Sequence, residues 1–475
     1  MTERPPTIWM NVTTSVNWQR PPVGIVRVER SLNTELGKLY GARFRQCVWQ
    51  DGQFVEWVPR VKNQTTDDTR QDNHAFPKQQ EKPVLPPIFP TLPKRQALIA
   101  IAQGLLSLMP RRLQPQFNRL LYALRPRVVR ILTNDRIRRL LGRIREKTSV
   151  NSDSLSSTVP LRSDESTPFA VGDVLISVGL DWDYSYYKEF YALRKQQGVK
   201  VVTCCYDLIP VLYPQYCVND VAGIFTSYFL EVADGSDLVL CISKQSEKDL
   251  NAMLDRTGGP RPPTLVFPLG DNVPLASDEK ISSEVMAVCR ERFILFVSTI
   301  ERRKNHEVLY RAYHLLCKQG KRLDLPKLVF VGMQGWGVGE LLKDIELDQQ
   351  TRDLIVRLNH VSDTELRVLY EESLFCVFPS LYEGWGLPVG EALSMGKAVI
   401  CSDRGSLPEV GGDLVRYAEP WNPQVWAEEI YRMATDDIWR RQWELRAKEQ
   451  YRVRTWIDAA CAVKEGIKGF EDHVK

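Results

Sequence analysis

Two glutamates, Glu383 and Glu391, flank a glycine-bearing turn in the segment SLYEGWGLPVGEALSMGKAVICS. The apolar run before the turn predicts a strand, and Pro388 favours a helix start, because a proline at the first helical position loses no hydrogen bond. Gly384 and Gly386 would let backbone amides approach a ligand, and the helix N-terminus would attract phosphate. A generic strand–turn–helix explains the glycines but not the paired glutamates. Since carboxylates repel phosphate, we expect both glutamates to accept hydrogen bonds from sugar hydroxyls.

The elements that must position these residues form two series of buried strands that alternate with helices. The first series starts at Gly172 and contains VLISVGL, VKVVTCCYDL and SDLVLCIS; the second contains RFILFVSTI, LPKLVFVGM, LFCVFPS and KAVICSD. Helices are expected in the second series at 306–318, 364–373 and 389–396. Continuous Val, Ile and Leu strands alternating with helices indicate parallel sheets covered on both faces. We therefore predict two doubly wound, Rossmann-like α/β domains facing a central cleft that holds the chemistry.

The chain is expected to have two domains, a terminal helix and an insertion. The N-terminal domain occupies 1–287, the C-terminal domain occupies 288–455, and a helix at 456–475 should pack back on the N-terminal domain. Polar, proline-rich stretches enclose basic helical segments in an insertion at about 60–170. Within it, residues 94–147 carry 14 Lys and Arg against two acidic residues, a local charge of +12 in a chain whose net charge is +4.

The overall composition is that of a globular protein of 475 residues, 43% hydrophobic and 26% charged. It excludes a mainly disordered chain, a fibrous protein and a small disulfide-rich protein. The ten cysteines form no CxxC pair or Cys/His cluster, and the five histidines have no metal-ligand spacing, so we expect reduced thiols, a cytoplasmic protein and no bound metal. The N-terminus has no apolar signal core, and the apolar run at 97–109 is shorter than the roughly 20 residues of a membrane-spanning helix.

The segment around the two glutamates resembles the E-x7-E signature of retaining glycosyltransferases of family 4, which have the GT-B fold. Further segments resemble parts of that family in the family's order: VSTIERRKNHEVLYRAY (297–313), VFVGMQGWG (329–337), HVSDTELRVLY (360–370) and SDRGSLPEVGGD (402–413). In the first half, PPVGIVRVERSL (21–32) resembles the family's first glycine loop, and YDLIPVLYPQYC (206–217) resembles a second motif. The resemblance covers nearly all of 290–456, while the insertion has no counterpart.

By position, the resemblance implies a nucleotide-sugar site in the C-terminal domain and an acceptor side in the N-terminal domain. Arg303 and Lys304 would clamp the diphosphate of the donor, because two fixed cations neutralise charge that develops on the leaving group. A solvated charge cluster is the alternative for this basic pair. Glu391 would hold the ribose hydroxyls and Glu383 the hydroxyls of the transferred sugar. The expected donor-binding residues are Gly24, Gly332, Gly384, Gly386, Leu387 and Glu391; for Gly24, a simple turn is the alternative.

On the acceptor side, Asp207 is a candidate for orienting the acceptor hydroxyl, with capping of the following turn as the alternative. Tyr206 stands where many relatives carry a histidine that faces the donor sugar, so it either substitutes for that contact or points elsewhere. Asp181 and Asp183 form an Asp-x-Asp pair, and such carboxylates can share one divalent ion. Because the basic pair already supplies positive charge, we place these aspartates on the acceptor side and expect an enzyme without metal or other cofactor.

The basic part of the insertion, 94–147, allows three interpretations: a solvated helical hairpin, a nucleic-acid patch, or an attachment to an anionic membrane surface. Aromatic residues that could stack on bases are sparse there, which argues against nucleic acid. An apolar segment flanked by basic pairs, followed by Arg-rich helices with a Leu stripe, is typical of an interfacial membrane segment. We expect peripheral attachment at the cytoplasmic face of the inner membrane and no nucleic-acid partner.

The resemblance implies retaining transfer of a hexose-type sugar to a glycan or lipid-linked acceptor in bacterial surface polysaccharide synthesis, such as that of O-antigen or capsule. We expect mannose as the sugar and GDP-mannose or a related nucleotide sugar as the donor. No protein nucleophile is required, since the departing phosphate oxygen can take the acceptor's proton. One alternative is a nucleotide-sugar epimerase of the same architecture, for which His306 or His360 would have to serve. Another is a non-catalytic nucleotide-sugar-binding partner subunit, which Tyr206 favours and the complete charged set opposes.

Overall fold

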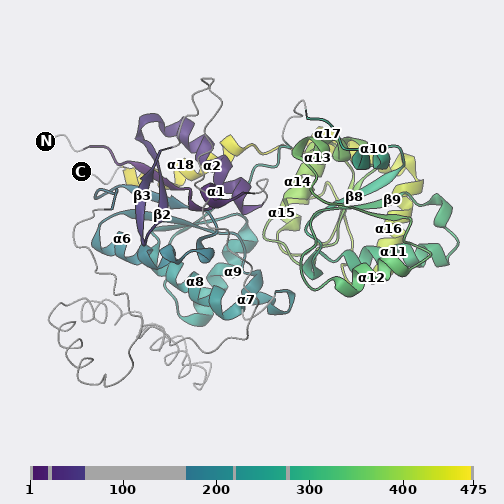
Figure 1. Ribbon diagram of the computed structural model, residues 1–475, viewed down its shortest axis with the longest axis horizontal. Coiled ribbons are helices and arrows are strands. Elements are labelled where there is room, and N and C mark those ends of the chain that lie inside the picture. Colours follow the sequence, from purple (N-terminus) through teal and green to yellow (C-terminus); the bar gives the residue numbers. More distant parts are fainter. Residues whose placement is uncertain (1–3, 20–23, 59–166, 218–220, 274–278, 472–475) are drawn as a thin grey trace, which may run out of the picture. The chain divides into compact units, whose positions relative to one another are not determined.

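The computed structural model describes residues 4–19, 24–58, 167–217, 221–273 and 279–471. The chain divides into two compact units, of which the larger comprises Met1–Glu56, Thr158–Leu254 and Pro260–Lys475 and holds both β-sheets (Figure 1). The smaller unit comprises Trp57–Ser157 and Asp255–Gly259. The basic segment 94–147 lies outside the described residues, so its predicted membrane attachment stays a prediction.

The first sheet has seven strands in the order β3-β2-β1-β4-β5-β6-β7. Their bounds are β1 (Ile8–Asn11), β2 (Phe44–Gln50), β3 (Gln53–Trp57), β4 (Val174–Ser177), β5 (Lys200–Cys205), β6 (Leu238–Cys241) and β7 (Thr264–Val266). Strand β1 pairs in parallel with β2 and β4, and the parallel ladder continues through β5 and β6 to β7. Strands β1, β4 and β6 are buried along their whole length, as the continuous apolar runs require.

Helices cover both faces of this sheet, as alternate side chains of a strand demand (Figure 1). Ile176 faces a core that includes residues of α2 (Ile25–Tyr40) and α18 (Trp456–Glu471), whereas its neighbour Leu175 packs with α6 (Phe190–Gln196). Helices α8 (Val221–Gly235) and α9 (Lys244–Thr257) share that second face with buried residues of β5 and β6. The C-terminal helix α18 therefore completes the first sheet's core, where it packs on α2.

One edge of the first sheet departs from the predicted purely parallel arrangement. Strands β2 and β3 are joined by only two residues, Asp51 and Gly52, with φ of 49° and 86°. Positive φ at both central residues is the signature of a type I′ hairpin turn, and so short a connection joins antiparallel strands. The Asp-Gly dipeptide between alternating apolar residues was the local signal for this hairpin.

The second sheet has six strands in the order β10-β9-β8-β11-β12-β13, and its neighbouring strands are parallel. The strands are β8 (Phe293–Val297), β9 (Lys327–Val331), β10 (Ile355–Leu358), β11 (Cys376–Phe378), β12 (Val399–Cys401) and β13 (Arg416–Tyr417). Figure 1 shows helices on both sides of this sheet: α10 (Ser283–Cys289), α13 (Asp363–Glu372) and α17 (Asp437–Gln450) on one, and α11 (His306–Lys318), α12 (Gly339–Leu347) and α16 (Pro423–Thr435) on the other. Two doubly wound α/β sheets, parallel apart from the β2–β3 hairpin, are what the GT-B fold class requires, so that prediction is confirmed.

Helix ends in the second sheet follow local chemistry. Helix α11 spans the predicted 306–318, while α13 begins at Asp363 with a capping box between Ser362 and Glu365. Helix α14 (Leu387–Ser394) begins two residues before the predicted start, so Pro388 occupies its second position. No helix within the described ranges combines the length and the apolar character needed to cross a membrane.

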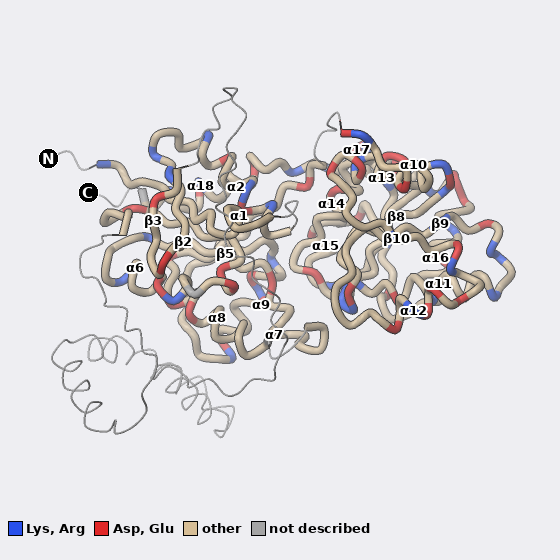
Figure 2. The backbone as a smooth tube through the Cα atoms, in the orientation of Figure 1, with Lys and Arg blue, Asp and Glu red and all other residues tan. Residues whose placement is uncertain are grey.

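Lys and Arg are interspersed with Asp and Glu along the outer helices of the second sheet (Figure 2). Many of these residues pair locally, as Arg416 does with Glu429 at 2.7 Å and Arg311 with Glu307 along α11. Such exposed pairs contribute little to stability. The buried charged residues Arg303, Lys304 and Glu383 lie instead in the loops that follow β8 and β11.

Candidate active site

The loop after β8 holds the basic pair in a fixed direction. Residues Arg302–Lys304 form one tight turn, in which the backbone N–H of Lys304 donates to the carbonyl of Glu301 at 3.1 Å. Asn305 follows in the left-handed conformation with φ of 60°, which asparagine tolerates better than most residues. Its Nδ2 donates to the carbonyl oxygens of Pro379 at 3.1 Å and Pro420 at 2.8 Å. Asn305 thus joins this loop to the loops that follow β11 and β13.

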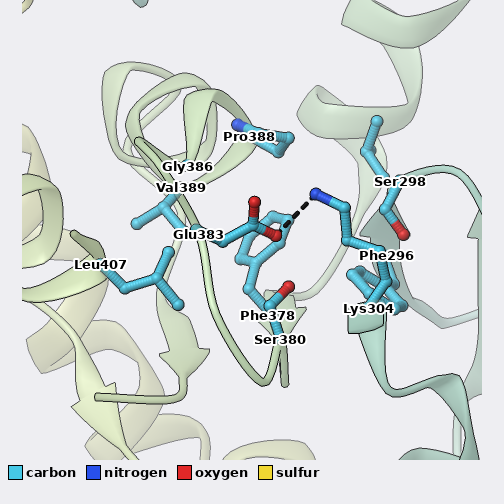
Figure 3. Close-up of a pocket in the computed structure, with 11 residues that line it drawn as sticks. Phe296, Ser298, Lys304, Phe378, Ser380, Glu383, Gly386, Pro388, Val389 and Leu407 are labelled. Carbon is cyan, nitrogen blue, oxygen red and sulfur yellow. Dashed lines mark hydrogen bonds and ion pairs between the residues drawn. The ribbon is translucent and has the colours of Figure 1, made fainter. Parts of the chain in front are cut away.

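Both cations of the loop converge on Glu383. Arg303 Nη1 donates to Glu383 Oε2 at 2.8 Å and to the carbonyl of Tyr382 at 2.7 Å. Lys304 Nζ donates to Glu383 Oε1 at 2.6 Å, and Figure 3 shows its amine directed at the carboxylate. The side chains are 16%, 18% and 12% exposed for Arg303, Lys304 and Glu383. The structure therefore brings together three residues that were assigned to the donor from two separate motifs.

Burial and charge act against each other in this cluster. Burial alone would raise the pKa of Glu383, but Arg303 and then Lys304 lower it to about 2. Burial lowers the pKa of Lys304, although Glu383 opposes that shift. Burial also opposes the charge of Arg303, yet Glu383 and Glu301 raise the pKa of this guanidinium. Glu383 is therefore an ionised carboxylate held between cations that the fold has already oriented.

A small pocket opens beside this cluster, as Figure 3 shows. Its apolar wall includes Phe296, Phe378 and Leu407, and its polar lining is Ser298, Lys304, Ser380 and Glu383. The start of α14 closes one side, where Gly386 is the N-cap with φ of 110°, a conformation that L-residues rarely adopt. The N-terminal amides of α14 and the Lys304 ammonium thus border the same space, which suits an anionic group.

The other glycines and Leu387 lie around this loop. A Cβ on Gly384 would come within 2.5 Å of the carbonyl of Tyr206, and one on Gly332 within 2.1 Å of the carbonyl of Ser298, so both positions need the close approach that glycine permits. Leu387 is the first residue of α14. Gly24 caps α2 with φ of 52° and has open space beside it.

Glu391 belongs to a second buried group, apart from the pocket lining. Its side chain accepts hydrogen bonds from Tyr370 Oη at 3.0 Å and from Arg27 Nη1 at 2.9 Å. Arg27 also donates to Asp363 at 3.1 Å, so one arginine from α2 joins two carboxylates of the second sheet's helices. Burial raises the pKa of Glu391, and Arg27 opposes that shift. Glu383 and Glu391 therefore have different partners, although they are near in sequence.

The acceptor-side candidates differ in where their side chains point. Asp207 Oδ1 accepts the backbone N–H of Ile209 at 3.0 Å, which is the turn-capping bond. Burial raises the pKa of Asp207 while Arg303 opposes it, so this carboxylate lies within the electrostatic reach of the clamp. The Tyr206 hydroxyl donates to the carbonyl of Val178 and is buried. Of the two possibilities that the sequence left open for Tyr206, its hydroxyl points elsewhere in this structure.

The Asp-x-Asp pair follows β4 and has mainly local partners. Asp181 is 1% exposed and accepts hydrogen bonds from Ser177 at 2.9 Å and Tyr186 at 2.7 Å. Burial raises its pKa to about 7 against those hydrogen bonds, and burial raises the pKa of the exposed Asp183 as well. Within the part of the chain that the structure describes, no group of three His, Cys, Asp or Glu is arranged to hold a metal ion.

Four residues of the site were not singled out from the sequence: Glu301, Asn305, Arg27 and Tyr370. Glu301 and Asn305 flank the basic pair in ERRKN, and that adjacency was the signal for them. Arg27 and Tyr370 lie in two segments that resemble the family, 21–32 and 360–370, but their contacts with Glu391 join distant segments that no local pattern connects. His306, by contrast, is only 1% exposed and lies against the rings of Phe296 and Phe330, and burial lowers its pKa to about 3.

Comparison with known proteins places this chain in a family. Residues 278–450 match the family described as glycosyl transferases group 1. The O-antigen chain mannosyltransferase B of Escherichia coli is 30% identical over 277 residues, which are 58% of this chain and 71% of that protein. The serotype-specific mannosyltransferase WbdA of Escherichia coli is 28% identical over 273 residues, or 56% of this chain, which spans only 33% of that longer relative.

Among solved structures, the sucrose-phosphate synthase of Thermosynechococcus elongatus aligns over 62% of this chain and 73% of its own, with 22% identity and a TM-score of 0.47. The identity and coverage shared with the Escherichia coli O-antigen enzyme, together with the family match over the second sheet, settle the assignment. The chain belongs to the group 1 glycosyltransferases.

Proposed function

We propose that this protein transfers a hexose-type sugar from a nucleotide-diphosphate sugar to a glycan or lipid-linked acceptor, with retention at the anomeric carbon. The observation that carries the proposal is the convergence of Arg303 and Lys304 on Glu383 in a pocket that the start of α14 borders. Two buried cations and a helix N-terminus form a site for a diphosphate, and a carboxylate in the same pocket can accept sugar hydroxyls.

In this proposal the diphosphate replaces the Glu383 carboxylate as the partner of Lys304. Glu383 then turns its oxygens to the hydroxyls of the transferred sugar, while amides around Gly386 and Leu387 contact the sugar or the phosphate. The negative charge of the donor grows on the leaving group as the glycosidic bond breaks. Cations that the fold has already oriented stabilise that charge without reorganising, and each is worth about 10²–10³ in rate.

The acceptor's proton goes to the departing phosphate oxygen on the same face of the sugar, so no protein nucleophile is needed. We assign the orientation of the acceptor hydroxyl to Asp207, whose carboxylate lies within the electrostatic reach of the clamp. Asp181 and Asp183 belong to the acceptor side at the end of β4. Because the basic pair supplies the positive charge, we propose an enzyme that works without a metal or other cofactor.

The sugar and pathway are inferred from the relatives. Both Escherichia coli relatives described above are mannosyltransferases, and one is an O-antigen chain enzyme. We therefore propose mannose as the sugar, GDP-mannose as the donor and a growing surface polysaccharide as the acceptor. Attachment of residues 94–147 to the anionic cytoplasmic face of the inner membrane would bring the enzyme to a lipid-linked acceptor, with no role for nucleic acid.

The alternative of a nucleotide-sugar epimerase is opposed at His306, one of its two candidate histidines. His306 is buried between aromatic rings and its pKa is depressed to about 3, so it is unsuited to exchange protons with a substrate. A non-catalytic nucleotide-sugar-binding partner is opposed by the complete set of Arg303, Lys304 and Glu383.

The test is a two-step measurement on the full chain. Thermal shifts with UDP, GDP, ADP and dTDP identify the base, since a ligand that binds the native state stabilises it. Incubation with GDP-mannose and an α-mannoside acceptor, followed by NMR of the product's anomeric proton, then tests transfer and retention. Stabilisation by GDP and an α-linked product are expected. No nucleotide stabilisation, or release of an epimerised free nucleotide sugar without any acceptor, would overturn the proposal.

A further inference from the structure

Glu301 is a buried carboxylate beside the clamp that the proposed function does not use. Its side chain is 5% exposed, and its Oε1 accepts a hydrogen bond from Arg303 Nη2 at 2.7 Å. Its own carbonyl accepts the backbone N–H of Lys304, so Glu301 begins the tight turn that carries both cations. A carboxylate so well shielded from water is retained only with a strong partner, and here that partner is the Arg303 guanidinium.

Arg303 is held from two sides, whereas Lys304 is not. The two terminal nitrogens of Arg303 reach different carboxylates, Nη1 to Glu383 and Nη2 to Glu301, and Nη1 also reaches the Tyr382 carbonyl. Among the ion pairs of the described residues, Lys304 has a single partner, Glu383, which it shares with Arg303. Lys304 and Glu383 line the pocket, but neither Arg303 nor Glu301 does. The two cations therefore stand in different places: Lys304 faces the ligand space, and Arg303 lies behind Glu383 against Glu301.

This asymmetry matters when a diphosphate arrives. The negative phosphate competes with Glu383 for both cations, and in the proposed function Glu383 turns to the sugar. Lys304 then exchanges one anionic partner for another. Arg303 would lose its Glu383 contact and could swing toward the phosphate, because its long side chain has many rotamers. Glu301 is only 5% exposed and does not line the pocket, so we expect the Arg303–Glu301 contact to persist through the exchange.

We propose that Glu301 is a positioning residue for sugar transfer: it is the permanent counterion of Arg303 and keeps this guanidinium in place while Glu383 changes partners. The inference rests on the proposed function and deepens it, since it divides the basic pair into Lys304, which meets the leaving group, and Arg303, whose orientation Glu301 sets.

The charge of Glu301 gives this role a distinctive kinetic signature. Arg303 and Lys304 are balanced by Glu301 and Glu383, so the unliganded cluster is neutral. A negative charge next to the diphosphate site opposes the binding of an anion, while the geometry that it fixes favours the transition state. Removal of this charge should therefore lower turnover without weakening nucleotide binding. A residue that merely supports the loop would lose both together when it is replaced.

The experiment compares Glu301→Gln, Glu301→Ala and the control Glu307→Gln in the full chain. The Glu307→Gln control removes the same charge three residues after Lys304. Glu307 is 53% exposed, and among the described residues its ion pair is with Arg311 in the next turn of α11. The dissociation constant of GDP is measured by calorimetry, and kcat and KM are measured with GDP-mannose. For Glu301→Gln, kcat should fall at least about tenfold. The affinity for GDP should equal that of the parent protein or exceed it by up to about threefold. Glu301→Ala should lose a further factor in kcat, because no oxygen remains to accept from Arg303.

A double-mutant cycle tests whether Glu301 acts through Arg303. In an Arg303→Lys background the shorter, single-point cation cannot bridge two carboxylates, so Glu301→Gln should cost little more. In a Lys304→Arg background it should cost its full tenfold. Equal costs in both backgrounds would overturn the inference. So would a normal kcat in Glu301→Gln, or a loss of GDP affinity in proportion to kcat.

These outcomes are separate from failure of the proposed function. If the parent protein neither binds a nucleoside diphosphate nor consumes a nucleotide sugar, the donor site itself is refuted and the inference falls with it. If the parent protein is active and the Lys304 variants lose turnover while Glu301→Gln does not, only the positioning role is refuted. The Glu307→Gln control should match the parent within about twofold in every measurement, since an exposed charge is screened by solvent.

Discussion

Replacement of Lys304 by methionine should abolish most transfer yet leave the fold almost as stable as before. Methionine keeps a flexible chain of similar length but cannot carry charge. If Lys304 neutralises the leaving group, its loss removes one preorganised contact to developing charge, worth about 2.7–4 kcal/mol or about 10²–10³ in turnover. The effect should appear in kcat as well as in kcat/KM, because the contact strengthens as the glycosidic bond breaks.

The stability side of this prediction follows from the two pKa shifts of the pair, which are both downward but have opposite effects on stability. The pKa of Glu383 falls from 4.5 to about 2, equivalent to about 3 kcal/mol, and Arg303 is the larger favourable cause. The pKa of Lys304 is lowered because burial outweighs its attraction to Glu383, so its charge costs stability at neutral pH. In Lys304→Met, Glu383 keeps Arg303 and the fold no longer buries an ammonium. We expect these effects to leave a net change of about 1 kcal/mol or less, or under about 4 °C in Tm.

Arg303→Met is the informative contrast, because it leaves Glu301 and Glu383 buried without their shared cation. It should destabilise the protein by about 3–5 kcal/mol. Lys343→Met, at an exposed lysine of α12, serves as the neutral control for both properties. Urea unfolding and initial rates with GDP-mannose measure the two quantities. Turnover of Lys304→Met above a tenth of the parent value would refute its role at the leaving group, and destabilisation as large as that of Arg303→Met would refute the burial argument.

Three further outcomes are expected. Glu391→Ala should raise the dissociation constant of GDP about tenfold or more, because ribose hydrogen bonds to an ionised group are lost; calorimetry that shows unchanged affinity would remove Glu391 from the ribose site. Burial raises the pKa of Asp181 from 3.8 to about 7, so its contribution to stability is full below pH 3.8 and is lost as pH rises to about 7. Between pH 5 and pH 8, the free energy of unfolding of Asp181→Asn should therefore rise relative to that of the parent protein by on the order of 2 kcal/mol, as measured by urea unfolding. A difference between the two proteins that does not change with pH would contradict the pKa shift. Residues 94–147 should make the protein pellet with anionic but not neutral liposomes, and 1 M salt, with a Debye length of roughly 3 Å, should release it. Equal binding to both kinds of vesicle, or to neither, would show that the segment is a solvated hairpin. If binding to anionic liposomes is observed, it should weaken further when Arg136, Arg138 and Arg139 are changed to Glu.

The two sheets could be predicted because their central strands are apolar at every position. VLIS of β4 and LVLC of β6 are buried on both faces, so no alternation obscures them. The β2–β3 hairpin was missed for the opposite reason. Strand β3 forms the edge of the sheet, and its neighbour β2, FRQCVWQ, is partly exposed and lacks a continuous apolar run. The start of α14 was placed too late, because Leu387 looks like an ordinary loop residue until the left-handed Gly386 is seen before it.

The donor-side cluster was accessible to sequence reasoning where topology alone brings residues together. Arg303 and Lys304 follow β8, Glu383 follows β11, and these strands are neighbours in a parallel sheet, so their following loops must meet at one edge. The contact between Arg27 and Glu391 could not be foreseen, because it depends on how two helices from different sheets approach each other. The direction of the Tyr206 hydroxyl depends in the same way on a single backbone carbonyl, that of Val178.

Asn305 also exposes the enzyme to a form of chemical ageing. Its side-chain amide donates to the carbonyls of Pro379 and Pro420, and only a nitrogen can make both bonds. Deamidation would replace that nitrogen with a negatively charged oxygen, which faces the two carbonyl oxygens and repels both. The loops after β8, β11 and β13 would then separate, and the proposed donor site would be lost although every charged residue in it remained intact. Asn305→Asp reproduces the damage, and the loss of turnover in stored protein should follow the appearance of a 1 Da heavier peptide that contains this residue.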